Sequence, residues 1–210
     1  MLRPLILACC LFALLFACGD GLEDRSETSE IGMRQDYRVD PATGFRQGIS
    51  REYDSEGRLV GEENYVDDVL QGKRKLYHGP SGKVIVEETY ADGEFQGEYL
   101  TYDTLGRPTA TGQYLEGQMA GEWTFYYANG QVKERVTFAE NNENGPFREW
   151  YEDGTRKAAG TYKDGDKENG ILHLYAEDGT LERVMNCEMA VCRTQWTPDS
   201  TFAAPAEPTF

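Results

Sequence analysis

The chain has 210 residues, with 37 Asp and Glu against 21 Lys and Arg, so its formal net charge is −16. A contact with nucleic acid phosphates or anionic lipid headgroups needs the opposite sign, which excludes both as favoured partners. Apolar content is 39%, 23 residues are glycine and mean hydropathy is −0.64. This composition disfavours a thick globular core and favours a thin sheet whose faces are both partly wet.

The N-terminus carries the features of a targeting segment. Arg3 is the only charged residue before Asp20, and the apolar run 5–17 is too short to span a bilayer. The run ends in Leu15-Phe16-Ala17-Cys18, which resembles the bacterial lipobox, where cleavage precedes a cysteine that then receives a diacylglycerol. We therefore predict a lipoprotein signal peptide over 1–17 and lipidation of Cys18.

Two alternatives remain at this end of the chain. Ile6-Leu7-Ala8-Cys9 also resembles a lipobox but would leave a very short apolar core, and an ordinary signal peptide or short anchor helix would explain the same run. Lipidation at Cys18 would place the chain in the bacterial cell envelope, and Gly19 after the cysteine favours the outer membrane. Loss of Arg3 with the signal peptide changes the formal net charge to −17.

Two segments precede the repeats. Residues 18–30 are acidic and poor in apolar side chains, which predicts a disordered tether. Residues 31–47 contain one strand-like stretch ending at Tyr37 and then a turn-rich stretch, which predicts an N-terminal cap strand and a loop.

Residues 48–187 form six repeats of 24 or 25 residues. A glycine opens each unit, an aromatic residue follows five positions later, a second glycine comes next, and a second aromatic closes five of the six units. The four columns are Gly48, Gly72, Gly97, Gly121, Gly145 and Gly170; Tyr53, Tyr77, Tyr102, Tyr126, Trp150 and Tyr175; Gly57, Gly82, Gly106, Gly130, Gly154 and Gly179; and Tyr65, Tyr90, Tyr114, Phe138, Tyr162 and Cys187. A fixed period of this length is the signature of a solenoid-like array.

Each unit is predicted to be a β-hairpin. The strand after the second glycine alternates, with Val132, Val136 and Phe138 on one face and Glu134 as the exception on that face. Asn129 before Gly130 favours a type I′ turn there, in which both central residues have positive φ. Turn-like pairs also join the units: Asp92-Gly93, Glu116-Gly117, Asn141-Asn142 and Asp164-Gly165. Two strands per unit and the cap strand give roughly thirteen strands.

The segment 188–210 is predicted to be a C-terminal cap and an irregular tail. Cys187 and Cys192 form an even pair in a chain expected to be exported, so we predict a disulfide that closes the end of the sheet, with 193–196 as a closing strand. Free thiols and a redox site are the alternatives.

The repeat resembles the MORN (membrane occupation and recognition nexus) repeat, and most closely the bacterial variant found in proteins catalogued as YwqK-family antitoxins of toxin–antitoxin systems. Gly121-Glu122-Trp123-Thr124-Phe125-Tyr126-Tyr127-Ala128-Asn129-Gly130 carries the resemblance most clearly, within a match that extends from about Ile31 to Asn186. The resemblance implies an all-β fold: an elongated, single-layer antiparallel sheet of tandem hairpins that serves as a binding platform.

Residue constellations for catalysis are missing from the sequence. His78 and His173 fall about four repeats apart, and there is no zinc-ligand spacing, nucleophile elbow or phosphate-binding loop. Paired carboxylates such as Glu62-Glu63 and Glu87-Glu88 recur at matching positions, which favours solvated strand positions over acid–base pairs. We therefore expect no enzyme activity, no cofactor and no metal.

The aromatic columns have two interpretations: a ladder that stabilises a sheet without a thick core, or a surface for a partner. We favour the ladder for the regular columns. Five further aromatic residues are predicted to form a partner-binding patch in the fourth and fifth units: Trp123, Phe125, Tyr127, Phe147 and Tyr151.

Two functions follow. The first is a non-enzymatic, membrane-anchored platform that binds or scaffolds a protein partner in the cell envelope. The second, implied by the resemblance, is an antitoxin or immunity protein of a toxin–antitoxin system, which from outside the cytoplasm would neutralise an envelope-acting toxin.

Overall fold

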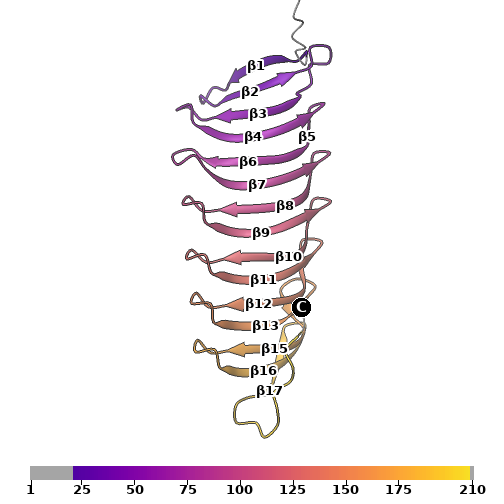
Figure 1. Ribbon diagram of the computed structural model, residues 1–210. Helices are drawn as coiled ribbons and strands as arrows, with labels where there is room; N and C mark the ends of the chain where they lie inside the picture. Colours follow the sequence, from indigo (N-terminus) through magenta and orange to yellow (C-terminus); the bar gives the residue numbers. More distant parts are fainter. Residues whose placement is uncertain (1–20, 209–210) are drawn as a thin grey trace, which may run out of the picture.

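Residues 21–208 are described by a computed structural model and form one antiparallel sheet of 17 strands (Figure 1). The strands follow one another across the sheet in chain order, and each pairs with its predecessor apart from two short interruptions. The predicted elongated single-layer sheet of tandem hairpins is confirmed. The predicted signal peptide and Cys18 lie outside the described residues.

The repeats occupy β3 to β16, between the two strands β1 and β2 and the closing strand β17. The bounds are β1 Glu23–Thr28, β2 Arg34–Val39, β3 Gly48–Tyr53, β4 Leu59–Val66, β5 Val69–Leu70, β6 Gly72–His78, β7 Lys83–Ala91, β8 Glu94–Tyr102, β9 Pro108–Leu115, β10 Gln118–Tyr126, β11 Val132–Ala139, β12 Asn142–Trp150, β13 Arg156–Lys163, β14 Lys167–Glu168, β15 Gly170–Tyr175, β16 Leu181–Glu188 and β17 Val191–Trp196.

The turn at the second glycine of each unit differs from the prediction. Gly130 has a φ of +88°, but Asn129 is not among the residues with positive φ, so the turn is not type I′. Gly130 N donates to Tyr127 O (2.9 Å) and Tyr127 N donates to Gln131 O (2.8 Å). This is a three-residue loop closed by a left-handed glycine, and the Asn129 side chain stabilises it by accepting from Gln131 N (2.9 Å).

The two-residue turns with positive φ at both positions lie instead between units. Asp92 and Gly93 have φ of +51° and +82°, and the flanking residues Ala91 and Glu94 pair across the hairpin. In the fourth link the turn residues are Glu140 and Asn141, one position earlier than predicted. The intrinsic right-handed twist of paired strands favours this turn geometry at a tight connection.

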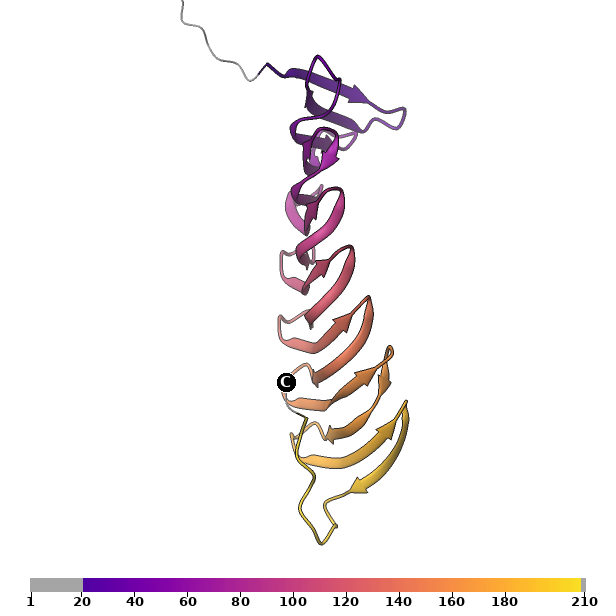
Figure 2. The same cartoon turned by 90° about the vertical axis from the view of Figure 1, so that its right-hand side faces the viewer.

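The glycine that opens each unit lies at a β-bulge or a strand break. Between the pairs Ala120–Gln113 and Thr124–Thr111, β10 advances four residues while β9 advances two, and Gly121, with φ of +69°, lies in this interval. Bulges bend a strand and increase its twist. Viewed edge-on, the hairpins are accordingly bent rather than flat (Figure 2).

The acidic segment before the cap strand is not the disordered tether predicted over 18–30. Residues 23–28 form β1, which pairs with β2 through six residue pairs. Tyr37 donates to Glu27 (2.6 Å) and Ser26 donates to Asp36 (2.7 Å) across this ladder. Backbone pairing and cross-strand polar contacts therefore order a strand that buries little apolar surface.

The C-terminal end contains the predicted disulfide and closing strand. Cys187 on β16 and Cys192 on β17 face each other in the ladder, with a Cα–Cα distance of 3.9 Å and a bond between their sulfurs. Beyond β17, residues 197–208 contain no strand, as expected for an irregular tail. The tail turns back along the sheet face that is toward the viewer in Figure 1.

The hydrophobic core lies on the opposite face of the sheet from the tail and belongs to the C-terminal units. Its buried members lie one each on β10, β11, β12, β13, β15 and β16: Trp123, Val136, Phe147, Ala158, Leu172 and Cys187. Partly buried aromatic side chains from neighbouring positions pack against them, including Tyr99, Tyr114 and Phe138. A single bent sheet thus buries a core without a second layer of secondary structure.

Candidate ligand-binding site

The predicted aromatic patch does not exist as one exposed surface. Trp123 and Phe147 are each only 2% exposed and belong to the core cluster, so the prediction that they contact a partner is wrong. Phe125 packs against the same cluster and is partly buried. The bend of the sheet gathers these side chains, an effect that strand alternation alone does not reveal.

The two tyrosines of the predicted patch bridge successive units. Tyr127 donates its hydroxyl hydrogen to Trp150 O (2.8 Å), and Tyr151 donates to Tyr175 O (2.9 Å). Each tyrosine directly follows the first strand of its unit. Its hydroxyl bonds the carbonyl oxygen of the last residue of the first strand in the next unit. These contacts give both side chains a structural role, and their contact with a partner stays a prediction.

In the N-terminal units, charged side chains lie beside the buried tyrosines Tyr65 and Tyr90. Arg74 on β6 forms ion pairs with Glu63 on β4 (2.8 Å) and Glu88 on β7 (3.2 Å), and Tyr90 donates to Glu88 (3.1 Å). Glu88 is only 7% exposed, so the prediction that Glu87-Glu88 is a solvated pair is wrong for Glu88. The partly exposed side chain of Arg74 holds this buried carboxylate, and the ion pair accounts for it without any catalytic role.

Glu134 lies on the core face, as its exceptional place in the alternation predicted. It pairs across the ladder with Glu149, and Lys157 forms an ion pair with Glu149 (2.8 Å). Burial first, and then the neighbouring carboxylates of Glu149 and Glu143, raise the pKa of Glu134 to about 7. The proximity of Lys157 and Lys133 opposes this rise but does not cancel it.

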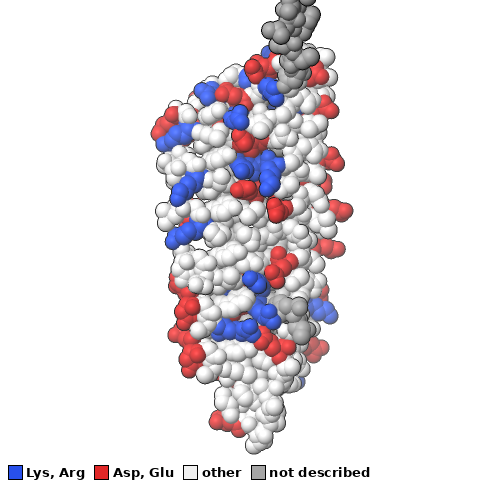
Figure 3. All heavy atoms as spheres, in the orientation of Figure 1, with Lys and Arg blue, Asp and Glu red and all other residues white. Residues whose placement is uncertain are grey.

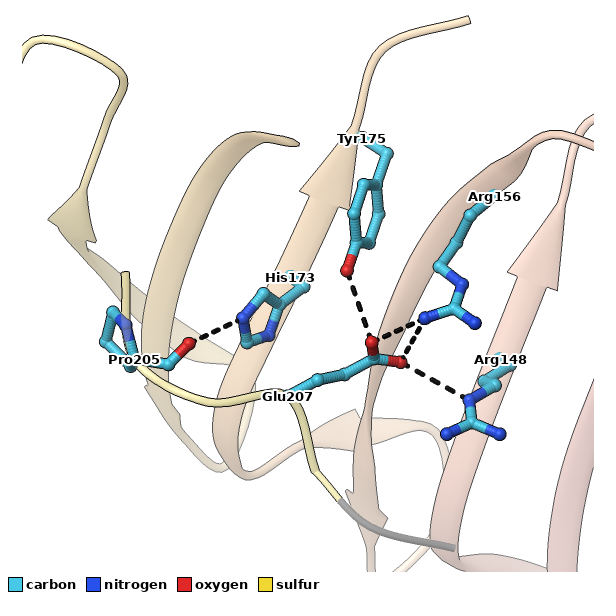
Figure 4. Close-up of polar contacts among 6 residues, drawn as sticks. All are labelled: Arg148, Arg156, His173, Tyr175, Pro205 and Glu207. Carbon is cyan, nitrogen blue, oxygen red and sulfur yellow. Dashed lines mark hydrogen bonds and ion pairs between the residues drawn. The ribbon is translucent and has the colours of Figure 1, made fainter. Parts of the chain in front are cut away.

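The most developed polar site lies on the other face, where the tail crosses β15, β13 and β12 (Figure 4). The carboxylate of Glu207 accepts from Arg156 Nη1 (2.6 Å) and from Arg148 Nε (3.3 Å), and Tyr175 donates to it (3.3 Å). Arg148 lies on β12, Arg156 begins β13 and Tyr175 ends β15. Three strands that are adjacent in the sheet therefore hold one carboxylate.

A histidine fixes the backbone of the same segment. His173 on β15 is 3% exposed, and its Nε2 lies 2.9 Å from the carbonyl oxygen of Pro205. Because a carbonyl oxygen only accepts, Nε2 carries the proton. The His173 and Tyr175 rings are stacked with centroids 6.3 Å apart, and the Arg156 guanidinium lies 5.8 Å from the Tyr175 ring centre. The site thus recognises a backbone carbonyl and, two residues later, a carboxylate.

The surroundings of this site are basic although the chain is acidic. Figure 3 shows Lys and Arg gathered beside the tail on this face. Arg135 on β11 is the ladder partner of Arg148, and its guanidinium lies 5.9 Å from the centre of the Trp150 ring. Net charge does not describe this local field, which attracts anions.

The sequence interpretation missed this site, although two exceptions in the repeat pattern marked it. Arg156 occupies a column that is otherwise Leu59, Val84, Pro108, Val132 and Leu181. Glu207 is the only acidic residue after Asp199. The positive charge of Arg156 and the negative charge of Glu207 are complementary. The sequence alone does not show that the tail folds back to bring them together.

Other functional features are few within residues 21–208. This part of the chain contains no group of three or more His, Cys, Asp or Glu side chains arranged to hold a metal ion. The same residues include no helix long and apolar enough to cross a membrane.

Comparison with known families identifies the repeat. Residues 46–67, 119–140 and 143–164 match the family described as MORN repeat variant. These segments are the first, fourth and fifth hairpin units, so the resemblance to MORN repeats is confirmed there. Such repeats are commonly protein- or membrane-binding modules and are generally not catalytic. No curated protein matches the chain.

Proposed function

We propose that the chain is a non-enzymatic binding platform for a protein partner, held at the bacterial cell envelope by a lipid on Cys18. One observation carries the platform role: a single-layer sheet exposes a face on which Arg148, Arg156 and His173 already hold an extended segment. The match of three units to a repeat family used in binding modules supports the same role.

The form of the sheet suits recognition of an extended ligand. Each unit presents the same face at a regular spacing of roughly 4.8 Å per strand, so a ligand that runs across the strands contacts several units. An array of this kind gains binding surface with each unit. The acidity of the chain disfavours nucleic acid as the partner.

The anchor is proposed from the sequence. Cys18 follows an apolar run that ends in a lipobox-like tetrapeptide, and Gly21, the first described residue, comes three positions later. We also propose that the chain resides in the outer membrane, because Gly19 directly follows Cys18.

Crosslinking in intact cells tests the function. Tagged full-length protein and its Cys18→Ala variant are compared by labelling with a fatty-acid analogue and by quantitative mass spectrometry of crosslinked proteins. We expect Cys18→Ala to lose the label. With the wild type, we expect to recover a defined partner in an amount nearly equal to that of the tagged protein. Label retained in the variant, or transferred to Cys9, refutes the anchor.

The same experiment tests the platform role. Recovery of no protein above the untagged control refutes it. A partner whose toxicity is suppressed by the chain would identify the neutralising role instead of scaffolding.

A further inference from the structure

The tail occupies its site through contacts that any similar segment can make. His173 contacts the carbonyl oxygen of Pro205, and Arg148, Arg156 and Tyr175 contact the carboxylate of Glu207. A carbonyl is present in every peptide, and a carboxylate in every Asp or Glu. The site therefore selects for an extended backbone with an acidic residue two positions after the contacted carbonyl.

The tail makes limited use of the surface it covers. Phe202, its largest apolar side chain among the described residues, is 59% exposed, and Ala206 is exposed. The side chain of Glu207 is 25% exposed, and the side chain of Arg156 is 34% exposed. Partly exposed ion pairs contribute modestly to stability, so a segment with more contacts can displace the tail.

A second cationic position lies next to the occupied one. Arg135 is exposed, and within residues 21–208 no carboxylate lies within ion-pair distance of its guanidinium. It pairs with Arg148 in the ladder, so the two arginine side chains leave the same face of neighbouring strands. From Pro205 at β15 to Glu207 at β12 and β13, the tail runs toward β11, where Arg135 lies.

We propose that this site binds an extended acidic segment of the partner protein, with one carboxylate between Arg148 and Arg156 and a second at Arg135, and that the C-terminal tail is its intramolecular competitor. This inference rests on the proposed platform function and names the chemistry of its ligand. Among the acidic residues of 197–208, Glu207 is the one in contact with these arginines, so it fills the first position and leaves the second for the partner.

The tail sets a threshold for binding. A tethered segment competes at an effective concentration on the order of millimolar, so a ligand that merely reproduces its contacts binds more weakly than it would to a site without the tail. A ligand with a second carboxylate gains a contact with Arg135 that residues 197–208 of the tail do not make. The tail thus selects for doubly acidic segments over singly acidic ones.

Fluorescence anisotropy with synthetic peptides tests the proposal on the full lipidated chain in nonionic detergent. The probes carry a C-terminal amide, so that glutamate supplies every carboxylate. They are a labelled peptide with the sequence of residues 201–210, its Glu-to-Gln version, and a version with a second glutamate two positions after the first. The proteins are wild type, Glu207→Lys to repel the tail from the arginines, and Arg156→Ala and Arg135→Ala in the Glu207→Lys background. Arg51→Ala, which removes an arginine from the same face in the first unit, is the matched control.

We expect the single-glutamate peptide to bind Glu207→Lys on the order of tenfold more tightly than wild type, because the competitor is removed. The Gln peptide should bind Glu207→Lys on the order of tenfold more weakly, as should the original peptide after Arg156→Ala. The second glutamate should tighten binding, and Arg135→Ala alone should abolish that gain. Arg51→Ala should have no effect.

Several results would overturn the proposal: equal binding of the Glu and Gln peptides, equal binding to wild type and Glu207→Lys, a gain from the second glutamate that survives Arg135→Ala, or an equal loss in Arg51→Ala. Because Arg156→Ala also removes packing, Arg156→Lys is measured beside it, with circular dichroism melting of every variant. Arg156→Lys keeps the charge but not the planar fork. If Arg156→Lys in the Glu207→Lys background binds the peptide as tightly as Glu207→Lys alone does, the carboxylate geometry proposed here is wrong.

The outcome separates this inference from the platform function. A partner that crosslinks equally to wild type, Glu207→Lys and Arg156→Ala, with no peptide binding, leaves the function standing and refutes the site. Peptide binding as expected without any crosslinked partner supports the site and refutes the platform function.

Discussion

The indole of Trp123 lies directly over Gly112, so closely that a β-carbon at Gly112 would be 2.1 Å from Trp123 Cδ2. Phe147 has the same relationship with Gly160, where a β-carbon would be 2.7 Å from Phe147 Cε1. Both glycines precede the second aromatic of their unit by two positions. In each case a large side chain fills the space that a glycine leaves on the adjacent strand. Trp123 thereby joins the fourth unit to the third, whereas Phe147 and Gly160 lock the two strands of the fifth unit together.

Gly112→Ala should destabilise the protein by about 1–3 kcal/mol, because the new methyl group overpacks the core against a ring that neighbours hold on all sides. Urea unfolding monitored by Trp fluorescence measures the change. Gly61→Ala is the matched control, since its β-carbon would lie 3.4 Å from Glu52 Cβ. Equal unfolding midpoints for the two variants would contradict the interlocking of Trp123 and Gly112.

The repeat made much of this fold predictable, because each glycine and aromatic column recurs at the same local geometry. All six opening glycines and all six second glycines have positive φ. The repeat period therefore marked twelve positions at which a side chain would strain the backbone. The prediction of a type I′ turn at Asn129-Gly130 was wrong because the same dipeptide also occurs in three-residue loops. The sequence does not distinguish the two loop lengths.

The burial of Trp123 and Phe147 and the tail site could not be predicted for a different reason. Alternation assigns a side chain to a face, but the bend of the sheet decides whether that face is buried. Glu207 reaches Arg156 across 51 positions of sequence, and nothing local in a tail of Ala, Pro and Thr specifies that path. The repeat constrains neighbours in the array, and the tail lies outside it.

Arg74→Met should destabilise the N-terminal units by about 2–4 kcal/mol, because it leaves the buried carboxylate of Glu88 without its ion-pair partner. Urea unfolding of the single variant, of Glu88→Gln and of the double variant forms a double-mutant cycle. The double variant should recover part of the loss. If the two single losses simply add, the Arg74–Glu88 contact carries no energy of its own.

The pH dependence of stability should report Glu134. Its pKa is raised from 4.5 to about 7 in the folded protein, so the folded state binds the proton more tightly. The contribution of this group to the free energy of unfolding therefore falls as the pH rises from about 4.5 to 7 and stays reduced above it.

Glu134→Gln should consequently stabilise the protein at pH 8, by about 1–3 kcal/mol, and change it little at pH 4. Urea unfolding at the two pH values measures the difference. Glu122→Gln, at an exposed position on the preceding strand, is the control and should show no such dependence. An equal effect of Glu134→Gln at pH 4 and pH 8 would show that its carboxylate ionises normally.

The disulfide at the end of the sheet should have a local effect. Cys187 stands where five other units have an aromatic residue, and it is 4% exposed within the core cluster. The two cysteines are five positions apart, so the entropic gain from closing this loop is small, about 2 kcal/mol or less. Its effect should be confined to β16 and β17, because units of a repeat array contact mainly their neighbours.

Reduction should therefore increase hydrogen exchange in the last unit while the first five units keep their protection. Hydrogen exchange with and without reductant, read by mass spectrometry of peptides from each unit, measures this directly. Cys187→Ala/Cys192→Ala in the absence of reductant controls for effects of the reductant on the rest of the chain. An equal fall in protection in all six units would mean that the array unfolds as a single cooperative body, and two free thiols in the native protein would mean that β17 is held by its ladder alone.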